Sequence, residues 1–508
     1  MSARFHPTPL TQTAPSLPGT GEVASRSKRI AADLAPAFLA GGEAAHLALE
    51  RLLGGALCVT TGQQPGLLTG PLFTVYKALT AVALAETLEE RFGEPVVPVF
   101  WVAGDDHDLA ESNHVRYLTR DNDVERVALR ERTPEAPLTP LYRETLGSEL
   151  TAVMAELVAQ SPETEFRTEV LSWLERHYRS DATYAEAFAG ALAELLGRFG
   201  LLVFRPTDEA AKRAMAPVLL DALRHAVPLD HALAARADEL RGVNRPAPVP
   251  VGDGAALVMM EDRLGRDRLV IDGDGFVTRR SGQQYDWRRL EEIAAHEPER
   301  LSPNVLLRPV VEAALLPTVA YVGGPGELAY LPQAAPVYER LGVGPQTPYP
   351  RWSGHVVEPR VDKVLAKYGL AIDDLRRPDL ESAVVRDEMP ESVQAPLVEL
   401  RAALGREYQR LQDAIRAVDS TLRKPVESTR NAALSGLTDL EKRIVAHLKK
   451  QNEIVVQQIG KARNSLFPDS QPQERMFTIA PYLIRHGMGL LDAALGAVRE
   501  QLHRAHSG

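Results

Sequence analysis

The sequence has only one cysteine, Cys58, among its 508 residues. A single thiol cannot form an intrachain disulfide, and it cannot build a structural zinc site that needs several thiolates. The sequence also lacks an excess of positive charge, since 58 Lys and Arg face 68 Asp and Glu for a net charge of −10. A general nucleic-acid-binding surface is basic, so we expect no nucleic-acid partner.

Long hydrophobic runs are missing as well. No window approaches about 18 consecutive apolar residues, the length of a membrane span, and the N-terminal MSARFHPTPL has no apolar signal core. We therefore expect no membrane contact and a cytoplasmic location. Hydrophobic residues make up 44% of the chain and charged residues 25%, which is typical of globular proteins. The chain is too long for one simple core, so two or three domains are expected.

The first part of the chain has the pattern of a βαβ unit. Residues 28–53 predict a helix, and GALCVTTG after them predicts a buried strand that holds Cys58 as a small hydrophobe. The glycine-rich TGQQPGLLTGP follows as a loop, and from Pro71 the apolar spacing becomes helical, with Thr69 as a candidate cap. EPVVPVFWVAG is then a second strand, which should run parallel to the first after a right-handed crossover.

Similar units return later in the chain. A strand is predicted near 201–205 with a helix from Glu209, and another near 317–322 with a glycine-rich turn and a further helix. The pieces between them are mostly helical (148–200 and 209–242), with a strand-rich patch near 255–279. The pattern predicts an α/β fold: a Rossmann-like, doubly wound parallel sheet within residues 1–385, with helical insertions near 119–200 and 209–300.

The C-terminal part changes character. Apolar residues there step by three and four, as in a coiled-coil seam, and they fall into two runs: Leu397, Leu400, Leu404, Tyr408, Leu411, Ile415, Val418 and Leu422, then Leu437, Leu440, Ile444, Leu448, Ile454 and Ile459. We expect an α-helical coiled coil over 386–466, with two arms of about 35 residues and with Pro425 and NAALSG as candidates for the turn or a kink between them. The helices of 467–508 should pack back on the core, and the seam favours a homodimer.

An acidic cluster follows the second strand, where ligands bind in open α/β sheets. Within GDDHDLAESNH, acids and histidines lie between Asp105 and His114. Capping of a helix start would need only one or two acids, so this density favours a catalytic site. The candidate catalytic residues are Asp105, Asp106, His107 and Asp108, one of which would act as a general base. Two histidines with carboxylates could also hold a metal, although no H-E-x-x-H spacing is present.

Two further polar loops, TGQQPGLLTGP and YVGGPGELAY, end at the same edge of the predicted sheet. Their glycines permit close backbone approach, and a helix N-terminus favours an anion. Neither loop matches G-x-x-x-x-G-K-[ST] or G-x-G-x-x-G. The candidate anion-binding or cofactor-binding residues are Thr61, Gly62, Gly66, Thr69, Gly70, Lys77, Gly323, Gly324 and Gly326. The candidate substrate-binding residues are Gln63, Gln64, Asn113, His114, Arg308 and Glu327, with Arg308 suited to clamp a carboxylate.

Several long blocks resemble the cysteine-adding enzymes of bacillithiol biosynthesis. They are TGQQPGLLTGPLFTVYKALT, PVFWVAGDDHDLAESNHV, SPNVLLRPVVEAALLPTVAYVGGPGELAY and, late in the chain, LFPDSQPQER. The resemblance implies a nucleotidyltransferase-like Rossmann core, a coiled-coil arm and a homodimer. It also implies a ligase that joins L-cysteine to glucosaminyl-malate through an amide bond, with ATP and Mg²⁺ activating the carboxylate.

The sequence departs from the nucleotidyltransferase pattern at one point. The helix start TGPLFTVYKA has no His-x-x-His signature, and no loop rich in Lys and Ser is present. Two other functions therefore stay open. One is a metal-dependent hydrolase or deacetylase that uses the Asp105–His114 cluster, and the other is a non-catalytic coiled-coil scaffold that binds a sugar conjugate.

Overall fold

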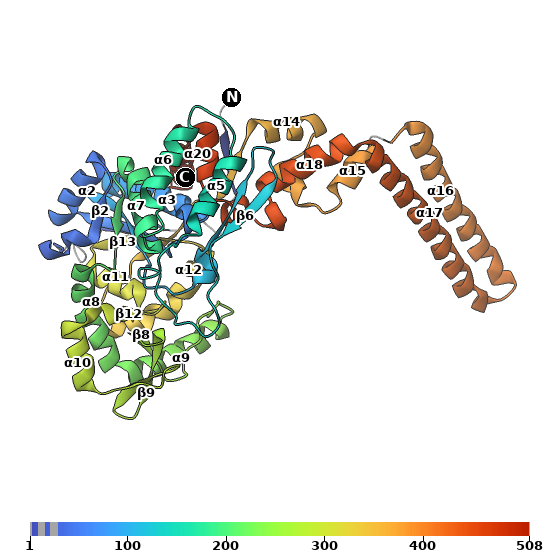
Figure 1. Ribbon diagram of the computed structural model, residues 1–508. Coiled ribbons are helices and arrows are strands. Elements are labelled where there is room, and N and C mark those ends of the chain that lie inside the picture. Colours follow the sequence, from blue (N-terminus) through green and yellow to red (C-terminus); the bar gives the residue numbers. More distant parts are fainter. Residues whose placement is uncertain (1–2, 9–15, 21–28, 388, 507–508) are drawn as a thin grey trace. The chain divides into compact units, whose positions relative to one another are not determined.

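The computed structural model describes residues 3–8, 16–20, 29–387 and 389–506. These residues form two compact units (Figure 1). The larger unit spans Ala3–Val356 and takes in the C-terminal segment Gln473–Gly508, whereas the smaller unit is built on Val357–Pro472. No helix in the described part of the chain is both long enough and apolar enough to cross a membrane.

A six-stranded sheet forms the centre of the larger unit. Its strand order is β14 (Thr347–Pro350), β13 (Thr318–Gly323), β3 (Leu57–Gln63), β4 (Val96–Val102), β7 (Leu202–Phe204) and β2 (Phe38–Ala40). The first five strands are mutually parallel, and β2 is an antiparallel edge strand. All five parallel strands therefore end at the same edge of the sheet, where their following loops meet.

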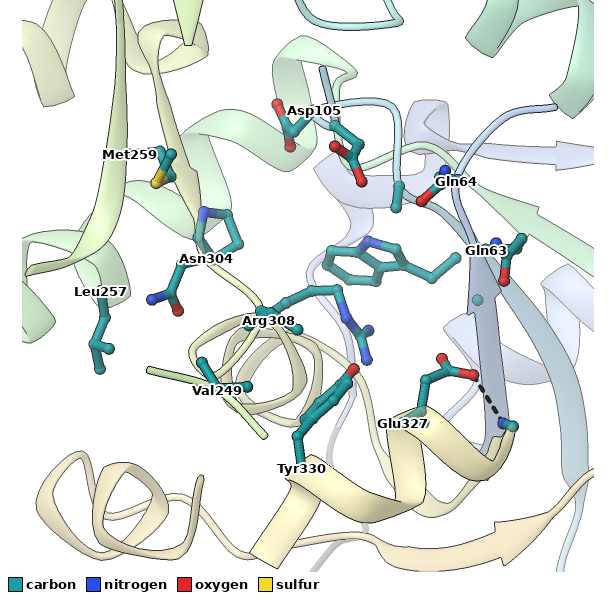
Figure 2. Close-up of a pocket in the computed structure, with 18 of the residues that line it drawn as sticks. Gln63, Gln64, Asp105, Val249, Leu257, Met259, Asn304, Arg308, Glu327 and Tyr330 are labelled. Atoms are coloured by element: carbon teal, nitrogen blue, oxygen red, sulfur yellow. Dashed lines mark hydrogen bonds between the residues drawn. The ribbon is translucent and has the colours of Figure 1, made fainter. Parts of the chain in front are cut away.

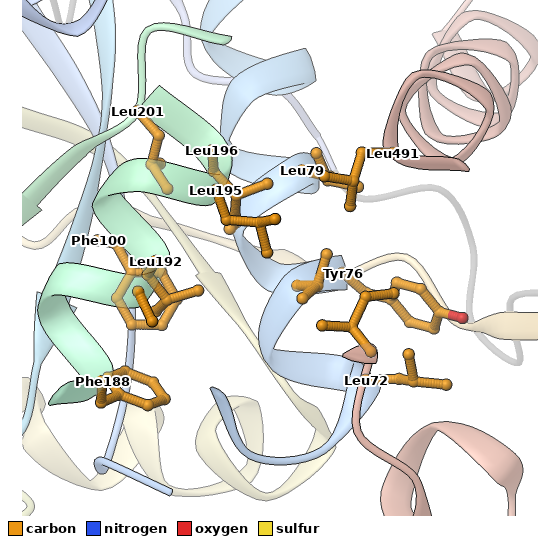
Figure 3. Packing of buried hydrophobic residues seen from close by; sticks show 14 of the residues in the cluster. Leu72, Tyr76, Leu79, Phe100, Phe188, Leu192, Leu195, Leu196, Leu201 and Leu491 are labelled. Carbon is orange, nitrogen blue, oxygen red and sulfur yellow. The ribbon is translucent and has the colours of Figure 1, made fainter. Parts of the chain in front are cut away.

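Both faces of this sheet are covered by helices. Along β4, Phe100 and Val102 belong to one hydrophobic core, while Val99 and Trp101 belong to a second core on the other face. Such burial on both sides explains why the strand is continuously apolar. The first core contains α3 (Leu72–Phe92), α7 (Tyr184–Leu196) and α21 (Gly489–His506), whose packing Figure 3 shows. The second contains α2 (Glu43–Leu53), α8 (Glu209–Arg224) and α11 (Arg308–Leu315).

Two insertions extend the larger unit. Between β4 and β7 lie α4 (Leu109–Ser112), the hairpin β5–β6 (His114–Leu118 and Val124–Ala128), α5 (Leu150–Gln160), α6 (Arg167–His177) and α7. Between β7 and β13 lie α8, α9 (Ala226–Gly242), α10 (Trp287–His296), α11 and an antiparallel sheet. That sheet has the order β11 (Gln284–Tyr285), β10 (Gly275–Thr278), β9 (Gly265–Asp272), β8 (Ala255–Asp262) and β12 (Leu301–Pro303). The predicted Rossmann-like fold with insertions is confirmed.

One predicted helix is wrong in part. The segment 28–53 was expected to be a single helix, yet its described residues contain a 3-10 turn (Ala32–Ala37), strand β2 and only then α2. The strand β2 pairs with β7, so a tertiary contact overrides local helix propensity. Thr69 also fails to cap α3, because its Oγ1 donates to the Leu68 carbonyl and Pro71 occupies the cap position.

The smaller unit is entirely helical among its described residues. It contains α14 (Pro359–Tyr368), α15 (Leu380–Asp387), α16 (Glu391–Ala414), α17 (Arg423–Gln451) and α18 (Glu453–Leu466). The long helices α16 and α17 pack against each other, which confirms the coiled coil. The turn between them lies at 415–422, just before Pro425, and α17 continues through NAALSG, so the turn or kink expected at NAALSG is wrong. Proline is tolerated in the first turn of a helix, and Pro425 sits there in α17.

The C-terminal helices belong to the larger unit. The short α19 (Gln473–Met476) contacts α3 and β5, α20 (Ala480–His486) packs on α6, and α21 packs along α3. Gln473 is fully buried and exchanges two hydrogen bonds with the Val356 backbone, through its Oε1 at 2.7 Å and its Nε2 at 3.0 Å. The start of the C-terminal segment thus fixes the position of the residues that follow β14.

Candidate active site

A cavity of about 590 Å³ lies where the parallel strands end. Gln63 and Gln64 enter it from β3, Asp105 and Asp106 from the loop after β4, and Gly324 from the loop after β13. The insertion between β7 and β13 supplies the opposite side, as Figure 2 shows. The fold therefore brings together loops that are more than 200 residues apart in the sequence, as expected at the carboxyl edge of such a sheet.

A buried lysine holds the first acid of the cavity. Lys212, from α8, donates from Nζ to Oδ1 of Asp105 at 2.6 Å and to the Leu301 carbonyl at 2.9 Å. The Lys212 side chain is fully buried, and that of Asp105 is 13% exposed. An ion pair in such a site lies in a low dielectric, so Asp105 is held in one orientation.

The next two residues present different chemistry. Asp106 Oδ1 accepts hydrogen bonds from the backbone N–H groups of His107 at 2.7 Å and Asp108 at 3.2 Å, which leaves its other oxygen for a ligand. Burial and the positive charge of Arg266 lower the pKa of His107 below its ordinary value of 6.5. Arg266 Nη1 lies 3.5 Å from His107 Nδ1. A guanidinium can only donate, so Nδ1 is the acceptor and Nε2 carries the proton.

A second buried ion pair lies near the N-terminal end of α3. The Lys77 side chain is only 2% exposed, pairs with Glu327, and donates to the Gly62 carbonyl at 2.8 Å. Glu327 also accepts from the Tyr321 hydroxyl and from the Gly324 N–H. Burial acts to raise the pKa of Glu327, but the charge and hydrogen bond of Lys77 hold it below its usual value. The pair ties the ends of β3 and β13 together.

Arg308 lies in the middle of the cavity, at the start of α11 (Figure 2). Its Nη1 donates to the fully buried Glu312 at 2.8 Å, and its guanidinium lies 5.0 Å from the centre of the Tyr321 ring. Its Nη2 is buried beside Tyr330 without a well-formed hydrogen bond to any residue that the structure describes. A buried donor of this kind suits an anionic ligand, because an unmade hydrogen bond is costly.

Further cations lie on the side of β14. Arg351 is buried, donates from Nη2 to Glu474 at 2.5 Å, and lies 5.4 Å from the centre of the Phe73 ring. Arg475, next along α19, also lines the cavity and is exposed. The cavity thus combines acids that can bind an ammonium group with guanidinium groups that can bind carboxylates or phosphates.

Comparison with known protein families decides the identity of the chain. The model "Bacillithiol biosynthesis BshC, N-terminal Rossmann-like domain" matches residues 35–351, and "Bacillithiol biosynthesis BshC, C-terminal coiled-coil domain" matches residues 354–506. The chain belongs to the BshC family of bacillithiol biosynthesis. The family resemblance expected from the sequence is therefore confirmed.

Curated members of the BshC family are similar over nearly the whole chain. "Putative cysteine ligase BshC" of Chlorobaculum tepidum is 32% identical over 92% of this chain and 85% of its own length. The protein of the same name from Salinibacter ruber is 33% identical, over 87% of this chain and 81% of its own. The crystal structure of a putative arginyl t-RNA synthetase from Campylobacter jejuni covers 90% of this chain and 97% of its own, with 11% identity and a TM-score of 0.24.

The structure brings many of the predicted site residues of this BshC-family chain into the one cavity. They are Gly62, Gln63, Gln64, Lys77, Asp105, Asp106, His107, Arg308, Gly324, Gly326 and Glu327. Two of these residues also have a role in the packing of the fold. A Cβ on Gly62 would lie 2.8 Å from the Trp101 carbonyl oxygen, so glycine lets β3 and β4 approach. Lys77, expected to bind an anion, is instead buried against Glu327.

Other predicted residues do not line the cavity. They are Thr61, Gly66, Thr69, Gly70, Asp108, Asn113, His114 and Gly323. Thr61 and Thr69 are fully buried and donate to backbone carbonyls, and Gly66 packs on Gly70 inside the loop itself. Asp108 caps α4 by accepting from the Glu111 N–H.

Asn113 and His114 are also held by their own loop. Asn113 Nδ2 donates to the Arg130 carbonyl at 3.0 Å, and His114 Nδ1 lies 3.1 Å from the Ala110 carbonyl. Part of the acidic cluster is therefore a helix start and the beginning of strand β5, as the capping interpretation held, and of its ionisable residues Asp105, Asp106, His107 and Glu111 line the cavity.

Several site residues were not found from the sequence. Lys212 lies in the first turn of α8, which follows β7, and Arg351 follows β14 directly. Both residues therefore lie just beyond the carboxyl end of a strand. A charged residue just beyond a predicted strand is visible in the sequence and indicates a candidate site residue. Arg266 comes from the antiparallel insertion sheet, and Arg475 from the C-terminal segment, so no local pattern indicates them.

Proposed function

We propose that this BshC-family protein is a cysteine ligase that joins the carboxyl group of L-cysteine to the amino group of glucosaminyl-malate. The observation that carries the proposal is that the cavity presents both kinds of charge. Asp105 and Asp106 line it, and so do Arg308 and Arg475. Both substrates carry an amino group and carboxylates, so they need both kinds of partner.

The reaction forms one C–N bond. The amino nitrogen attacks the carbonyl carbon of activated cysteine, the leaving group departs with the electron pair of its bond to that carbon, and the amine loses one proton. We assign the proton to Asp106, since one of its oxygens is free of backbone donors. His107 in its neutral form offers the Nε2 proton to a developing oxyanion. Asp105, fixed by Lys212, orients the amine.

A free carboxylate is a poor electrophile, so we propose that ATP with Mg²⁺ activates it as an acyl adenylate or acyl phosphate. The residues fit an anion of this kind at two points. Arg308 Nη2 is a buried donor beside the cavity, and Arg475 is an exposed cation at its lining. Lys77 contributes less, because Glu327 already neutralises its charge. Arg351 contributes less for the same reason, because it is paired with buried Glu474. We expect Arg308 and Arg475 to hold the phosphates.

The two other functions have less support. Lys212 and Arg266 place cations beside Asp105 and His107, where a hydrolytic metal would have to bind. Among the described residues, no three His, Cys, Asp or Glu side chains are arranged to hold a metal ion. A scaffold that only binds a sugar conjugate does not need the buried ion pairs that orient Asp105 and Glu327.

The assignment of Asp106 is tested by replacing it with asparagine. Asp106→Asn keeps the size of the side chain but cannot accept a proton, so bacillithiol formation should fall by at least about a hundredfold, the usual contribution of a general base. The measurement is the bacillithiol content of cells that carry the variant in place of their own family member. Asp121→Asn, an exposed carboxylate in the turn of the β5–β6 hairpin, serves as control. Near-normal bacillithiol with folded Asp106→Asn would refute the assignment.

A further inference from the structure

One side of the cavity is largely apolar, although Asp253 and Arg268 from the same segments also line the cavity. Val249, Leu257 and Met259 line that side, and Figure 2 shows them across the cavity from Gln63, Gln64 and Glu327. Further apolar lining residues are Leu233, Val251 and Val305. L-cysteine, glucosamine and malate are small and polar, so none of them presents a broad apolar surface to such a wall.

The apolar side is rigidly built. The amide of Gln333, which is fully buried, accepts from the Val249 N–H and donates to the Val249 carbonyl, both at 3.0 Å. Asp230 accepts from the N–H groups of Gly252 at 3.0 Å and Gly254 at 3.2 Å. These bonds hold the segment between α9 and β8 at both of its ends, so its apolar side chains form a fixed wall.

Asn304 adds a neutral polar group of fixed orientation to this wall. Its Oδ1 accepts from the backbone N–H groups of Leu306 and Leu307, each at 3.0 Å, which fixes the amide at the start of α11. Its Nδ2 is therefore the remaining group that can serve a ligand, and it can only donate. Asn304 lines the cavity between Met259 and Arg308 (Figure 2).

We propose that this apolar side is the binding site for the adenine ring of ATP. A nucleobase is flat, apolar on its faces and rich in acceptor nitrogens at its edge, which matches a largely apolar wall with a fixed amide donor. The inference rests on the proposed ATP-dependent ligase, because adenine is the one flat aromatic group among its reactants. With adenine on the apolar side, the amine binds on the side of the cavity that holds Asp105 and His107.

Asn304→Asp provides a sharp test of the subsite. An aspartate keeps an oxygen for the N–H groups of Leu306 and Leu307, so the fold should persist, but it replaces the Nδ2 donor with an acceptor. A second variant, Val251→Asn, places a neutral polar group in the wall. Its matched control is Val243→Asn, an exposed valine at the end of α9 that does not line the cavity.

Isothermal titration calorimetry of the full chain with ATP and with inorganic tripolyphosphate, each with Mg²⁺, separates the base from the phosphates. We expect Asn304→Asp and Val251→Asn to weaken ATP by about tenfold or more, equivalent to about 1.4 kcal/mol. Tripolyphosphate binding and the Val243→Asn control should not change. Unchanged ATP affinity in both variants, or an equal loss for tripolyphosphate, would overturn the subsite.

The same titration distinguishes the inference from the proposed function. If the unaltered protein binds ATP and the variants do not weaken it, the adenine site lies elsewhere and the ligase proposal stands. If the unaltered protein binds neither ATP nor tripolyphosphate at millimolar concentration, ATP dependence itself is refuted, and the adenine subsite with it.

Discussion

At the scale of single residues, buried cations set the orientation and the charge state of the acids and the histidine in the cavity. Lys212 faces Asp105, Arg266 faces His107, and Lys77 faces Glu327. The candidate acids Asp105 and Asp106 could be found from the sequence because they follow a strand directly. Lys212 also lies just beyond a strand, so its position was a signal, whereas Arg266 comes from the insertion sheet and meets its neighbours only through the tertiary fold.

The state of His107 leads to a prediction about pH. Burial and the charge of Arg266 disfavour the imidazolium and lower the pKa of His107, so it should gain a proton only below pH 6.5 and stay neutral at pH 7. The measurement is an NMR titration of the histidine ring carbons, with the resonance assigned by its loss in His107→Gln. In Arg266→Met the midpoint should move upward, because the repelling cation is gone. A His107 midpoint at or above 6.5 in the unaltered protein would contradict this electrostatic account.

Some residues that were predicted from the sequence to bind an anion do not line the cavity. Thr61 and Thr69 suggest anion binding by their type, but their hydroxyls donate to backbone carbonyls inside the protein. In a strand, successive side chains point to opposite faces, and the direction of one threonine depends on the register of its neighbours. A sequence shows which polar residues are near a strand end, and the packing decides which of them reach the cavity.

At the scale of elements, a four-residue helix fixes one wall of the site. Glu474 in α19 pairs with Arg351 after β14, and its other oxygen accepts from the Gly354 N–H at 3.1 Å. The side chains of Arg351 and Glu474 are 5% and 8% exposed. Removal of one partner leaves the other charged and buried, which is more costly than the loss of a surface pair.

We therefore predict that Glu474→Ala lowers the free energy of unfolding by about 3–5 kcal/mol. Urea denaturation followed by tryptophan fluorescence reports on the relevant unit, since all four tryptophans lie within residues 3–356. The control is Glu86→Ala, which breaks the exposed Glu86–Arg499 pair and should cost less than about 1 kcal/mol. Equal, small losses for both variants would show that the buried pair does not hold this wall.

The helical arm carries a second prediction at this scale. Several residues of the expected seam remain exposed in the single chain, among them Leu411 at 47% and Leu440 at 48%. We expect a homodimer that covers them, with a mass near 111 kDa, which is twice 55.6 kDa. Size-exclusion chromatography with light scattering should show monomers for the double variant Leu411→Glu, Leu440→Glu. Val398→Glu, an exposed position outside the seam, should stay dimeric. A monomeric unaltered protein would refute the dimer.

The arm and the edge strand show why some element boundaries escape sequence reasoning. The heptad spacing predicted two long helices, but the turn at 415–422 carries no strong helix breaker. The strand β2 has three residues, too few for an alternating pattern, and forms because β7 offers an unpaired edge. Long periodic segments such as α3 and β4 were predictable because both local pattern and burial agree.

At the scale of the whole molecule, the order of strands and loops accounts for the location of the site. Five parallel strands end at one edge, and the loops after β3, β4, β13 and β14 all contribute to the cavity. Their order along the chain allowed the Rossmann-like fold to be predicted from the sequence. The apolar side of the cavity could not be predicted, because it is made by an insertion whose position against the sheet has no local signal.

The most direct test of the central claim is mass spectrometry of a reaction with the purified full-length protein. The mixture contains glucosaminyl-malate, L-cysteine and Mg²⁺, with ATP present or omitted. The cysteine-ligase account predicts that bacillithiol forms only with ATP, together with AMP from an acyl adenylate or ADP from an acyl phosphate. Bacillithiol that forms equally without ATP, or no bacillithiol at stoichiometric protein with every substrate present, would contradict it.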